Sequence, residues 1–226
     1  MTGKEARQAI PVVLKVNPQE PEPRLLEVAS YVITRGGLVV YPTDTVYGLA
    51  TNPFDLMSVV RLFDAKRRPM VKPIPLIASS LSDAARVVEV DEVFMEFATR
   101  FWPGPLTIVG RVRSWLPPQV TGFTDKVGVR VPDCLLARQL AKLAGGLITG
   151  TSANISGMPP PLVAEEAVRQ LGSFLDLVLD AGKTGGGTPS TVIDVSEGVV
   201  KVLRLGPVGV EEVEEVARGL GIEVQV

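Results

Sequence analysis

Residues 23–45 read PRLLEVASYVITRGGLVVYPTDT, and this stretch indicates the fold class. Leu26, Ala29 and Ile33 recur at the spacing of one helix face, so the stretch begins with a helix that Gly36 and Gly37 end. The apolar run 38–41 that follows predicts a short buried strand. The strand runs directly into Pro42 and a series of hydroxyl and carboxylate side chains. The stretch therefore predicts a helix, a buried strand and a polar loop at the end of that strand.

The same alternation continues along the chain. Further strands are expected at 74–78, 106–112, 127–131, 147–149, 177–179, 191–195 and 199–203, and an edge strand within the first 20 residues. Helices are expected after the capping residues Asp55, Ser82, Asp91 and Asp133, and over 162–171 and 210–218. Alternating helices and strands predict an α/β fold with a twisted, mixed, mostly parallel sheet and flanking helices. No repeat or long linker divides the pattern, so we expect a single domain over 1–226, with a short helix and tail at 208–226.

Composition excludes several classes of protein. Hydrophobic residues make up 46% of the 226 residues and charged residues 21%, which is typical of a globular protein. The 23 Lys and Arg against 25 Asp and Glu give a net charge of −2, so a strongly basic nucleic-acid footprint is absent overall. No run of about 20 apolar residues predicts a membrane span, and no signal-peptide core stands near the start. We therefore expect a cytoplasmic protein without a membrane partner.

The chain contains no histidine and only one cysteine, Cys134. Without histidine, the chain lacks the Ser-His-Asp and Cys-His nucleophile arrangements and the usual proton shuttle at neutral pH. A single cysteine excludes an intrachain disulfide and a cysteine-based metal cage. No Walker A loop is present, and no GxGxxG motif follows a strand. Any chemistry must therefore use Lys, Arg, hydroxyl and amide side chains, backbone amides, and a metal ion carried by a ligand phosphate.

Residues 66–72 contain four cations in the sequence KRRPMVK. Arg68 precedes a proline and so favours an extended conformation, in which residues two apart point the same way. On that basis Lys66 and Arg68 project together and suit a phosphate or another anion. A solvated basic turn is the alternative interpretation.

Two further polar positions lie in or beside buried strands. Ser152 and Asn154 belong to a loop of hydroxyl and amide groups at the end of the strand 147–149, and ligands of α/β sheets sit at strand ends. Arg130 lies within the apolar strand 127–131, where a guanidinium needs an anionic partner. Either a structural carboxylate or a ligand carboxylate fits that role, and Gly128 leaves space beside it. An ordinary polar connection is the alternative for the Ser152 loop.

Three more candidates lie at strand ends. Asp44 in YPTDTVYG is a candidate metal or ammonium contact, and an Asx or Thr turn is the alternative. Ser190 follows the glycine-rich segment 185–187, for which a flexible loop leading into a strand is the alternative, and Arg204 ends a strand as a candidate anion contact.

Seven segments taken in order resemble the YrdC-type family, whose members make threonylcarbamoyl-AMP for tRNA modification. The resemblance covers about residues 25–207 and includes the Lys66–Arg68 and Ser152–Asn154 pairs that are the hallmarks of the family. The segments are YPTDTVYGLA, KRRP with KPIPLI, WPGPLTIV, VGVRVPD, TSANISG, PSTVIDV and VLRLGPV.

The resemblance implies a reaction in which L-threonine, bicarbonate or CO2 and ATP give threonylcarbamoyl-AMP and pyrophosphate. Mg²⁺ enters on the ATP phosphates, and a transferase complex passes the product to tRNA. The family fold has a sheet that is concave on the ligand side. By position, Lys66 and Arg68 are the implied catalytic residues. The implied threonine contacts are Thr45, Arg130 and Ser190, and the implied nucleotide contacts are Arg68, Lys72, Lys126, Ser152, Asn154 and Arg204.

The sequence departs from the longer family members in two ways. Those members carry a further C-terminal domain and a histidine at the position of Ile77. Two alternative functions stay open: an RNA-binding module that uses the same basic groove, and a related enzyme with an altered substrate, as in the carbamoyltransferases of hydrogenase maturation.

Overall fold

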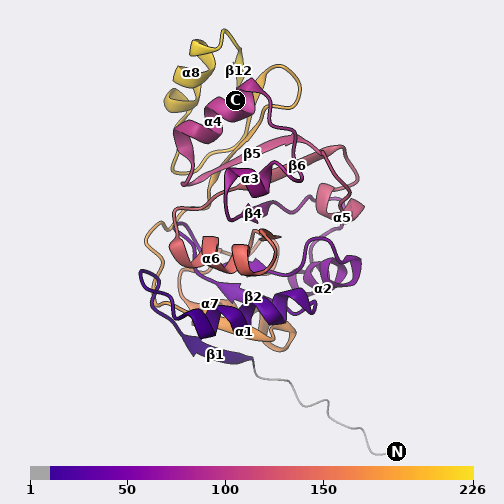
Figure 1. Cartoon of the computed structure of the whole chain (residues 1–226), viewed down its shortest axis with the longest axis vertical. Helices are drawn as coiled ribbons and strands as arrows, with labels where there is room; N and C mark the ends of the chain where they lie inside the picture. The colour runs from indigo at the N-terminus through magenta and orange to yellow at the C-terminus, as the bar shows by residue number, and fades with distance from the viewer. Residues whose placement is uncertain (1–10) are drawn as a thin grey trace, which may run out of the picture.

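The strands of the protein form two sheets in the computed structural model, which describes residues 11–226 (Figure 1). The first sheet has the order β1(Val12–Lys15), β9(Leu177–Asp180), β2(Val39–Tyr41), β3(Gly48–Ala50), β8(Thr151–Ser152). The second sheet has the order β12(Val224–Gln225), β11(Val200–Arg204), β10(Thr191–Asp194), β5(Leu106–Arg111), β6(Lys126–Arg130), β4(Leu76–Ala78), β7(Leu147–Thr149). Parallel pairing joins β1–β9, β2–β9, β5–β10, β4–β6 and β11–β12, and the other five pairs are antiparallel. The predicted mixed α/β fold is confirmed. The pairing is not mostly parallel as expected, because parallel and antiparallel pairs are equally frequent, and there are two sheets where the sequence analysis expects one.

Helices flank both sheets. They are α1(Pro23–Thr34), α2(Leu56–Lys66), α3(Leu81–Ala84), α4(Glu92–Phe101), α5(Pro118–Thr121), α6(Leu135–Leu143), α7(Ala164–Leu171) and α8(Val210–Gly219), with a 3₁₀ turn at Gly172–Phe174. As expected, the Asp55 carboxylate caps α2 by accepting from the amides of Met57 and Ser58. Asp91 caps α4 in the same way.

Two capping predictions are wrong. Ser80, not Ser82, caps α3, because its hydroxyl accepts from the Asp83 amide. Asp133 does not cap α6: the helix begins one residue later, with Cys134 at the cap position, and the Asp133 carboxylate instead pairs with Arg138.

Four elements were not expected from the sequence: β3, β8, α5 and β12. Each is four residues or shorter, so its hydrophobic pattern is too brief to show a period. The expected edge strand is β1, and residues 1–10, which share that prediction, lie outside the described part of the chain. Within residues 11–226, no helix has the length and apolar character needed to cross a membrane.

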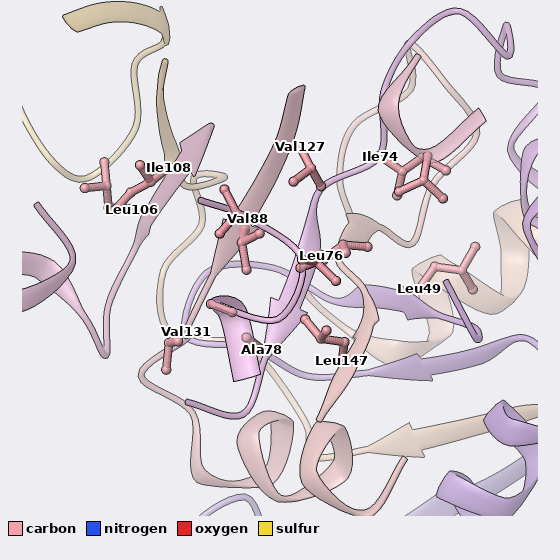
Figure 2. Packing of buried hydrophobic residues seen from close by; sticks show 14 of the residues in the cluster. Leu49, Ile74, Leu76, Ala78, Val88, Leu106, Ile108, Val127, Val131 and Leu147 are labelled. Atoms are coloured by element: carbon pink, nitrogen blue, oxygen red, sulfur yellow. The ribbon is translucent and has the colours of Figure 1, made fainter. Parts of the chain in front are cut away.

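The larger hydrophobic core joins the two sheets. Leu49 of β3, Leu76 of β4 and Ile108 of β5 all belong to it and are fully buried (Figure 2). A second cluster fills the space between α1, α6 and the first sheet, with Leu26 and Leu140 among its buried members. The two sheets therefore share packed side chains, which fixes their relative position.

A single residue, Gly150, separates β7 of the second sheet from β8 of the first. The amide of Gly150 donates to the carbonyl of Pro75 at 2.7 Å, on the second-sheet side. The Thr149 hydroxyl donates to the carbonyl of Leu49 at 2.9 Å and accepts from the Thr51 amide at 2.9 Å, on the first-sheet side. We call this meeting line of the two sheets, at residues 149–151, the junction.

Gly206 lies against the backbone that leads into β10. A Cβ atom at this position would lie 2.3 Å from the Pro189 carbonyl oxygen and 2.5 Å from the Thr191 nitrogen. Backbone cannot move aside as a flexible side chain can, so we expect Gly206→Ala to lower the free energy of unfolding by about 1–3 kcal/mol. Urea denaturation measures the change.

Gly185→Ala is the matched control, because no atom lies within 4 Å of the Cβ that it would add. Equal stability of the two variants would contradict the close approach at Gly206.

Candidate active site

A small cavity of about 120 Å³ opens at the junction and takes its lining from both sheets. Pockets for drug-sized ligands hold roughly 300–1,000 Å³, so this cavity fits a smaller molecule. The lining residues that the sequence analysis singled out are Thr45, Arg68, Arg130, Ser152, Ser190 and Arg204, and Tyr41, Val46, Pro75 and Ile77 contribute apolar surface. We call it the junction cavity.

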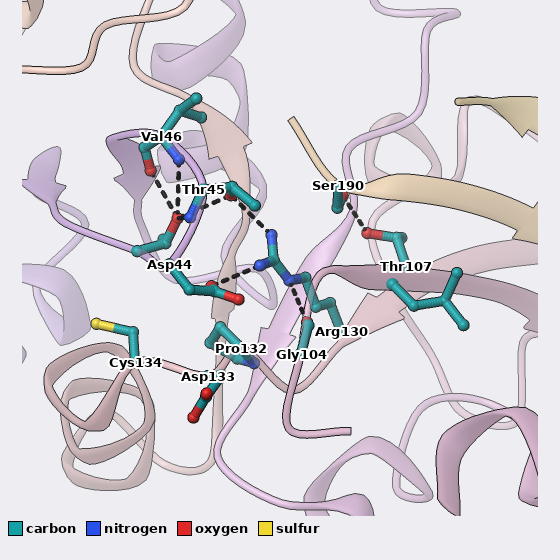
Figure 3. Close-up of polar contacts among 12 residues, drawn as sticks. Asp44, Thr45, Val46, Gly104, Thr107, Arg130, Pro132, Asp133, Cys134 and Ser190 are labelled. Atoms are coloured by element: carbon teal, nitrogen blue, oxygen red, sulfur yellow. Dashed lines mark hydrogen bonds and ion pairs between the residues drawn. The ribbon is translucent and has the colours of Figure 1, made fainter. Parts of the chain in front are cut away.

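The guanidinium of Arg130 joins the two sheets at one wall of this cavity (Figure 3). Its Nε donates to the carbonyl of Gly104 at 2.8 Å, and one terminal nitrogen donates to the hydroxyl of Thr45 at 3.0 Å. The other terminal nitrogen forms an ion pair with Asp44. Only 5% of Arg130 is exposed, so this set of partners makes its burial tolerable.

The geometry allows Arg130 both a structural carboxylate and a ligand carboxylate as partners. Asp44 is the structural carboxylate, and it serves Arg130 rather than a metal or an ammonium group. Residues 11–226 supply acceptors for three of the five guanidinium N–H groups. The other two N–H groups of Arg130, which lines the cavity, can donate hydrogen bonds to a ligand anion.

Hydroxyl groups line the cavity beside Arg130. Thr45 lies in the loop between β2 and β3, where the Thr43 hydroxyl accepts from the amides of Thr45 and Val46 and so holds the turn. The Ser190 hydroxyl lies 2.9 Å from that of Thr107 on β5 (Figure 3). Both Thr45 and Ser190 are buried. Each hydroxyl is held by a protein partner and also faces the cavity.

Arg68 and Arg204 carry charges without carboxylate partners. Arg68 donates to the carbonyls of Lys72 and Pro73, and Arg204 donates to the carbonyl and hydroxyl of Ser190. Among residues 11–226, no carboxylate forms an ion pair with either one. Partial burial lowers the pKa of both guanidinium groups, and the nearby Arg130 and Arg68 lower that of Arg204 further. This excess of positive charge favours an anion between the two side chains.

A second cavity of about 330 Å³ shares Arg68, Pro75 and Arg204 with the first. It lies against the second sheet, and its remaining lining residues are Pro73, Thr107, Val109, Thr121, Thr124, Lys126, Gly128, Val192, Asp194 and Leu203. We call it the sheet cavity. A Cβ on Gly128 would lie 3.3 Å from Thr107 and 3.4 Å from Val109, so the glycine keeps this part of the floor open.

The part of the sheet cavity around Lys126 is close to electrically neutral. Lys126 contacts Asp194 at 2.9 Å and Glu197 at 2.6 Å, and Lys201 contacts Glu197 at 2.6 Å. The hydrogen bonds from Lys126 and Lys201 lower the pKa of Glu197 to about 2, and those from Ser196 and Lys126 lower the pKa of Asp194. Both carboxylates are therefore ionised at neutral pH and balance the two lysines. The two cavities thus meet at a positive end, and the sheet cavity has a neutral end.

Three predicted site residues lie outside both cavities. Lys66 is buried, and its ammonium donates to the carbonyls of Ser152 and Asn154. The side-chain amide of Asn154 donates to the carbonyls of Ile155 and Met158 within its own loop. Lys72 is exposed, and only its carbonyl contacts Arg68.

The predicted extended conformation of residues 66–68 is wrong. Lys66 is the last residue of α2, and Arg67 adopts the left-handed conformation with φ 49°. The chain therefore turns between Lys66 and Arg68, and only Arg68 of the two lines the cavities. Ser152 and Asn154 differ in a similar way, because only Ser152 lines the junction cavity.

The sequence analysis did not single out four polar residues of the sheet cavity, Thr107, Thr121, Thr124 and Asp194. Thr107 is the one hydroxyl residue in an apolar strand, which is a weak signal on its own. Asp194 lies in the PSTVIDV segment but needed the pairing of β10 with its neighbours to reach Lys126. Within the described residues, no group of three acidic or cysteine side chains stands close enough to hold a metal ion.

Comparison with known proteins gives consistent relatives. The family model Sua5_yciO_yrdC, described as telomere recombination, matches residues 31–206. A threonylcarbamoyl-AMP synthase of Pyrococcus abyssi is 39% identical over 192 residues, which are 84% of this chain and 56% of that protein. A putative threonylcarbamoyl-AMP synthase of Mycobacterium tuberculosis is 36% identical over 207 residues, 90% of this chain and 94% of that protein.

Solved structures agree with these relatives. The crystal structure of P. abyssi Sua5 complexed with L-threonine has a TM-score of 0.89 and 35% identity, and it covers 95% of this chain and 62% of its own. The E. coli YciO structure has a TM-score of 0.82 at 26% identity, with 90% of this chain and 99% of its own covered. The chain therefore spans about three fifths of the P. abyssi protein and almost all of the shorter relatives.

The pair between Asp44 and Arg130 gives a stability prediction. Asp44→Ala leaves a buried guanidinium without its counter-charge, so we expect a loss of about 3–5 kcal/mol in the free energy of unfolding. Urea denaturation measures it.

Asp133→Ala removes a carboxylate that is 73% exposed and pairs with Arg138, and should change stability by less than about 1 kcal/mol. A loss at Asp44 no larger than at Asp133 would show that Arg130 does not depend on its carboxylate.

Lys66 gives a pH prediction. Burial, with a contribution from Arg68, lowers its pKa from 10.5 to about 7. Between these values the unfolded chain binds the proton more tightly, so this lysine makes the folded state less stable as the pH falls from about 10 to about 7. The free energy of unfolding of Lys66→Met, minus that of the unmodified protein, should therefore rise as the pH falls from about 10 to about 7, whatever its value at pH 10; urea denaturation at both ends measures it. The exposed Lys142, replaced by Met, should show no such trend, and parallel profiles for the two variants would contradict the shift.

Proposed function

The chain belongs to the Sua5/YciO/YrdC family, and we propose that it catalyses the formation of threonylcarbamoyl-AMP from L-threonine, bicarbonate or CO2, and ATP. The amine of threonine takes up CO2 to form a carbamate. A carbamate oxygen then attacks the α-phosphorus of ATP, and pyrophosphate leaves. The product carries its threonylcarbamoyl group on AMP, and a tRNA-modifying transferase is the enzyme that would consume it.

One observation carries this proposal: two cavities of different size and character share Arg68 and Arg204. A reaction between an amino-acid carbamate and a nucleotide needs two adjoining sites with an anion-binding group where they meet. The junction cavity has the smaller volume, and the sheet cavity has the larger.

The junction cavity suits threonine. The free N–H groups of Arg130 can bind its carboxylate, and Thr45 or Ser190 can bind its hydroxyl. Ile77 is 3% exposed and lines the cavity, so the position that holds histidine in longer family members gives an apolar wall here. A site that hydrogen-bonds the hydroxyl group rejects an analogue without it, since a buried polar group would be left unpaired.

The charge distribution orients the nucleotide in the sheet cavity. Phosphates are favoured at the positive end, between Arg68 and Arg204, and the uncharged nucleoside at the end where Lys126 is balanced by Asp194. The proposed attack on the α-phosphorus requires the α-phosphate to lie at this positive end, beside the junction cavity. Catalysis then depends on positioning and on neutralising the charge that develops on the phosphate, and needs no histidine.

Magnesium fits this arrangement as part of the Mg-ATP substrate. The carboxylates nearest the two cavities, Asp44 and Asp194, are each paired with a protein cation. We therefore place the ion on the triphosphate and assign no protein ligand to it.

The test is release of pyrophosphate by the purified chain with Mg-ATP, bicarbonate and L-threonine. We expect turnover to require threonine, and Arg68→Gln or Arg204→Gln to lower kcat/KM by roughly 10²–10³-fold, as for removal of a donor to transition-state charge. Arg67→Gln, next to Arg68 but exposed and outside both cavities, should retain activity.

The other outcomes would replace the proposal. Carbamoyl-phosphate turnover without any response to threonine would indicate a related enzyme with another substrate. RNA binding that falls steeply with salt and that ATP does not compete would indicate an RNA-binding module in the same groove.

A further inference from the structure

Lys66 does not reach either cavity, although it belongs to the KRRP segment beside Arg68. It is 1% exposed, lines neither cavity, and donates to the carbonyl of Ser152, which does line the junction cavity. Any contribution to the proposed reaction must therefore pass through another residue.

Three hydrogen bonds join the end of α2 to the loop 152–156. The Lys66 ammonium donates to the carbonyl of Asn154 at 2.7 Å and to the carbonyl of Ser152. In the opposite direction, the carbonyl of Lys66 accepts from the Ser156 amide at 2.8 Å. The loop is thus held to the helix by both the side chain and the backbone of one residue.

The other side of the same loop is also fixed. The side-chain amide of Asn154 donates to the carbonyls of Ile155 and Met158. The backbone amide of Ala153 donates to the carbonyl of Tyr47 at 2.9 Å. Among these loop residues, Ser152 lines the junction cavity, whereas Lys66 and Asn154 line neither cavity.

The charge on Lys66 has no carboxylate partner among residues 11–226. Its hydrogen bonds go to two neutral carbonyls, and burial lowers its pKa to about 7. An ammonium in this position provides directed N–H donors to the loop. Arg68, which turns the other way after the left-handed Arg67, provides the charge that faces the ligand.

We propose that Lys66 is a positioning residue that sets the hydroxyl of Ser152 at the edge of the junction cavity, and that it does not bind the nucleotide phosphates itself. This inference rests on the proposed function and changes the role that the resemblance implies for Lys66. Its contribution comes from donor hydrogens, and its effect on the reaction depends on Ser152.

A double-mutant cycle separates the two roles. Lys66→Met removes the donors and keeps a side chain of similar length, and Ser152→Ala removes the hydroxyl. We expect Lys66→Met to lower kcat/KM for ATP by roughly 10- to 100-fold in the unmodified protein, the range for hydrogen bonds to a charged donor. In the Ser152→Ala background the same change should cost less than about twofold, because interacting residues are not additive. An equal loss in both backgrounds would show that Lys66 contacts the substrate and would overturn the proposal.

Lys66→Gln adds a test that distinguishes hydrogen bonding from charge. Its amide keeps two donor hydrogens and carries no charge. A positioning role predicts that Gln restores part of the activity lost with Met, whereas a phosphate-binding role predicts that both variants are equally impaired. If Lys66→Met does not fold, the double-mutant cycle is measured with Lys66→Gln instead.

Hydrogen exchange supplies a readout that does not need turnover. In Lys66→Met, the amides of residues 152–158 should exchange faster, and those of the distant α8 should not change. Lys142→Met, on the exposed end of α6, is the matched control. Unchanged exchange at 152–158 would overturn the proposal. If the unmodified protein makes no threonylcarbamoyl-AMP, the proposed function fails, and the exchange experiment still decides whether Lys66 holds the loop.

Discussion

The buried ion pair between Arg130 and Asp44 is the interaction on which the site depends, because it crosses the line where the two sheets meet. A guanidinium within a strand of the second sheet loses its hydration and must find partners in the fold. It finds them in Asp44 and Thr45, on a loop of the first sheet, and in the carbonyl of Gly104. The requirement to satisfy one cation therefore fixes the loop that carries Thr45, and with it one wall of the junction cavity.

The contrast between paired and unpaired cations explains how this chain can do chemistry without histidine. Lys126 is balanced by two carboxylates, and Arg130 by one, while Arg68 and Arg204 are held by carbonyls that leave their charge available. Such fixed charges stabilise negative charge without moving protons, which is what the proposed attack on the α-phosphate of ATP requires. The charge in the sheet cavity therefore runs from a positive end, at Arg68 and Arg204, to a neutral end around Lys126.

The turn at Arg67 shows how a short motif can serve two purposes. Its left-handed backbone ends α2 and reverses the chain, so Lys66 points into the protein and Arg68 points to the cavities. The inward lysine contacts the loop of Ser152, and the outward arginine contacts the backbone of its own segment. Of two cations two residues apart, one therefore holds a loop and the other lines both cavities.

The sequence by itself determined the α/β class and most helices and strands, because hydrophobic period is a local property. Its motifs, together with the family resemblance that they carry, also indicated the residues Thr45, Arg68, Arg130, Ser152, Ser190 and Arg204 that line the junction cavity. Only the tertiary structure decided that there are two sheets, since β3 and β8 are too short to show a period and owe their pairing to distant strands. The tertiary structure also decided which cations of the described residues have no carboxylate partner. Lys66 and Arg68 look equivalent in the sequence, and whether each meets a carbonyl, a carboxylate or an open cavity depends on segments such as the Ser152 loop, 86 residues along the chain from Lys66. Spacing along the chain carries no information about such contacts, because packing of the core brings them together.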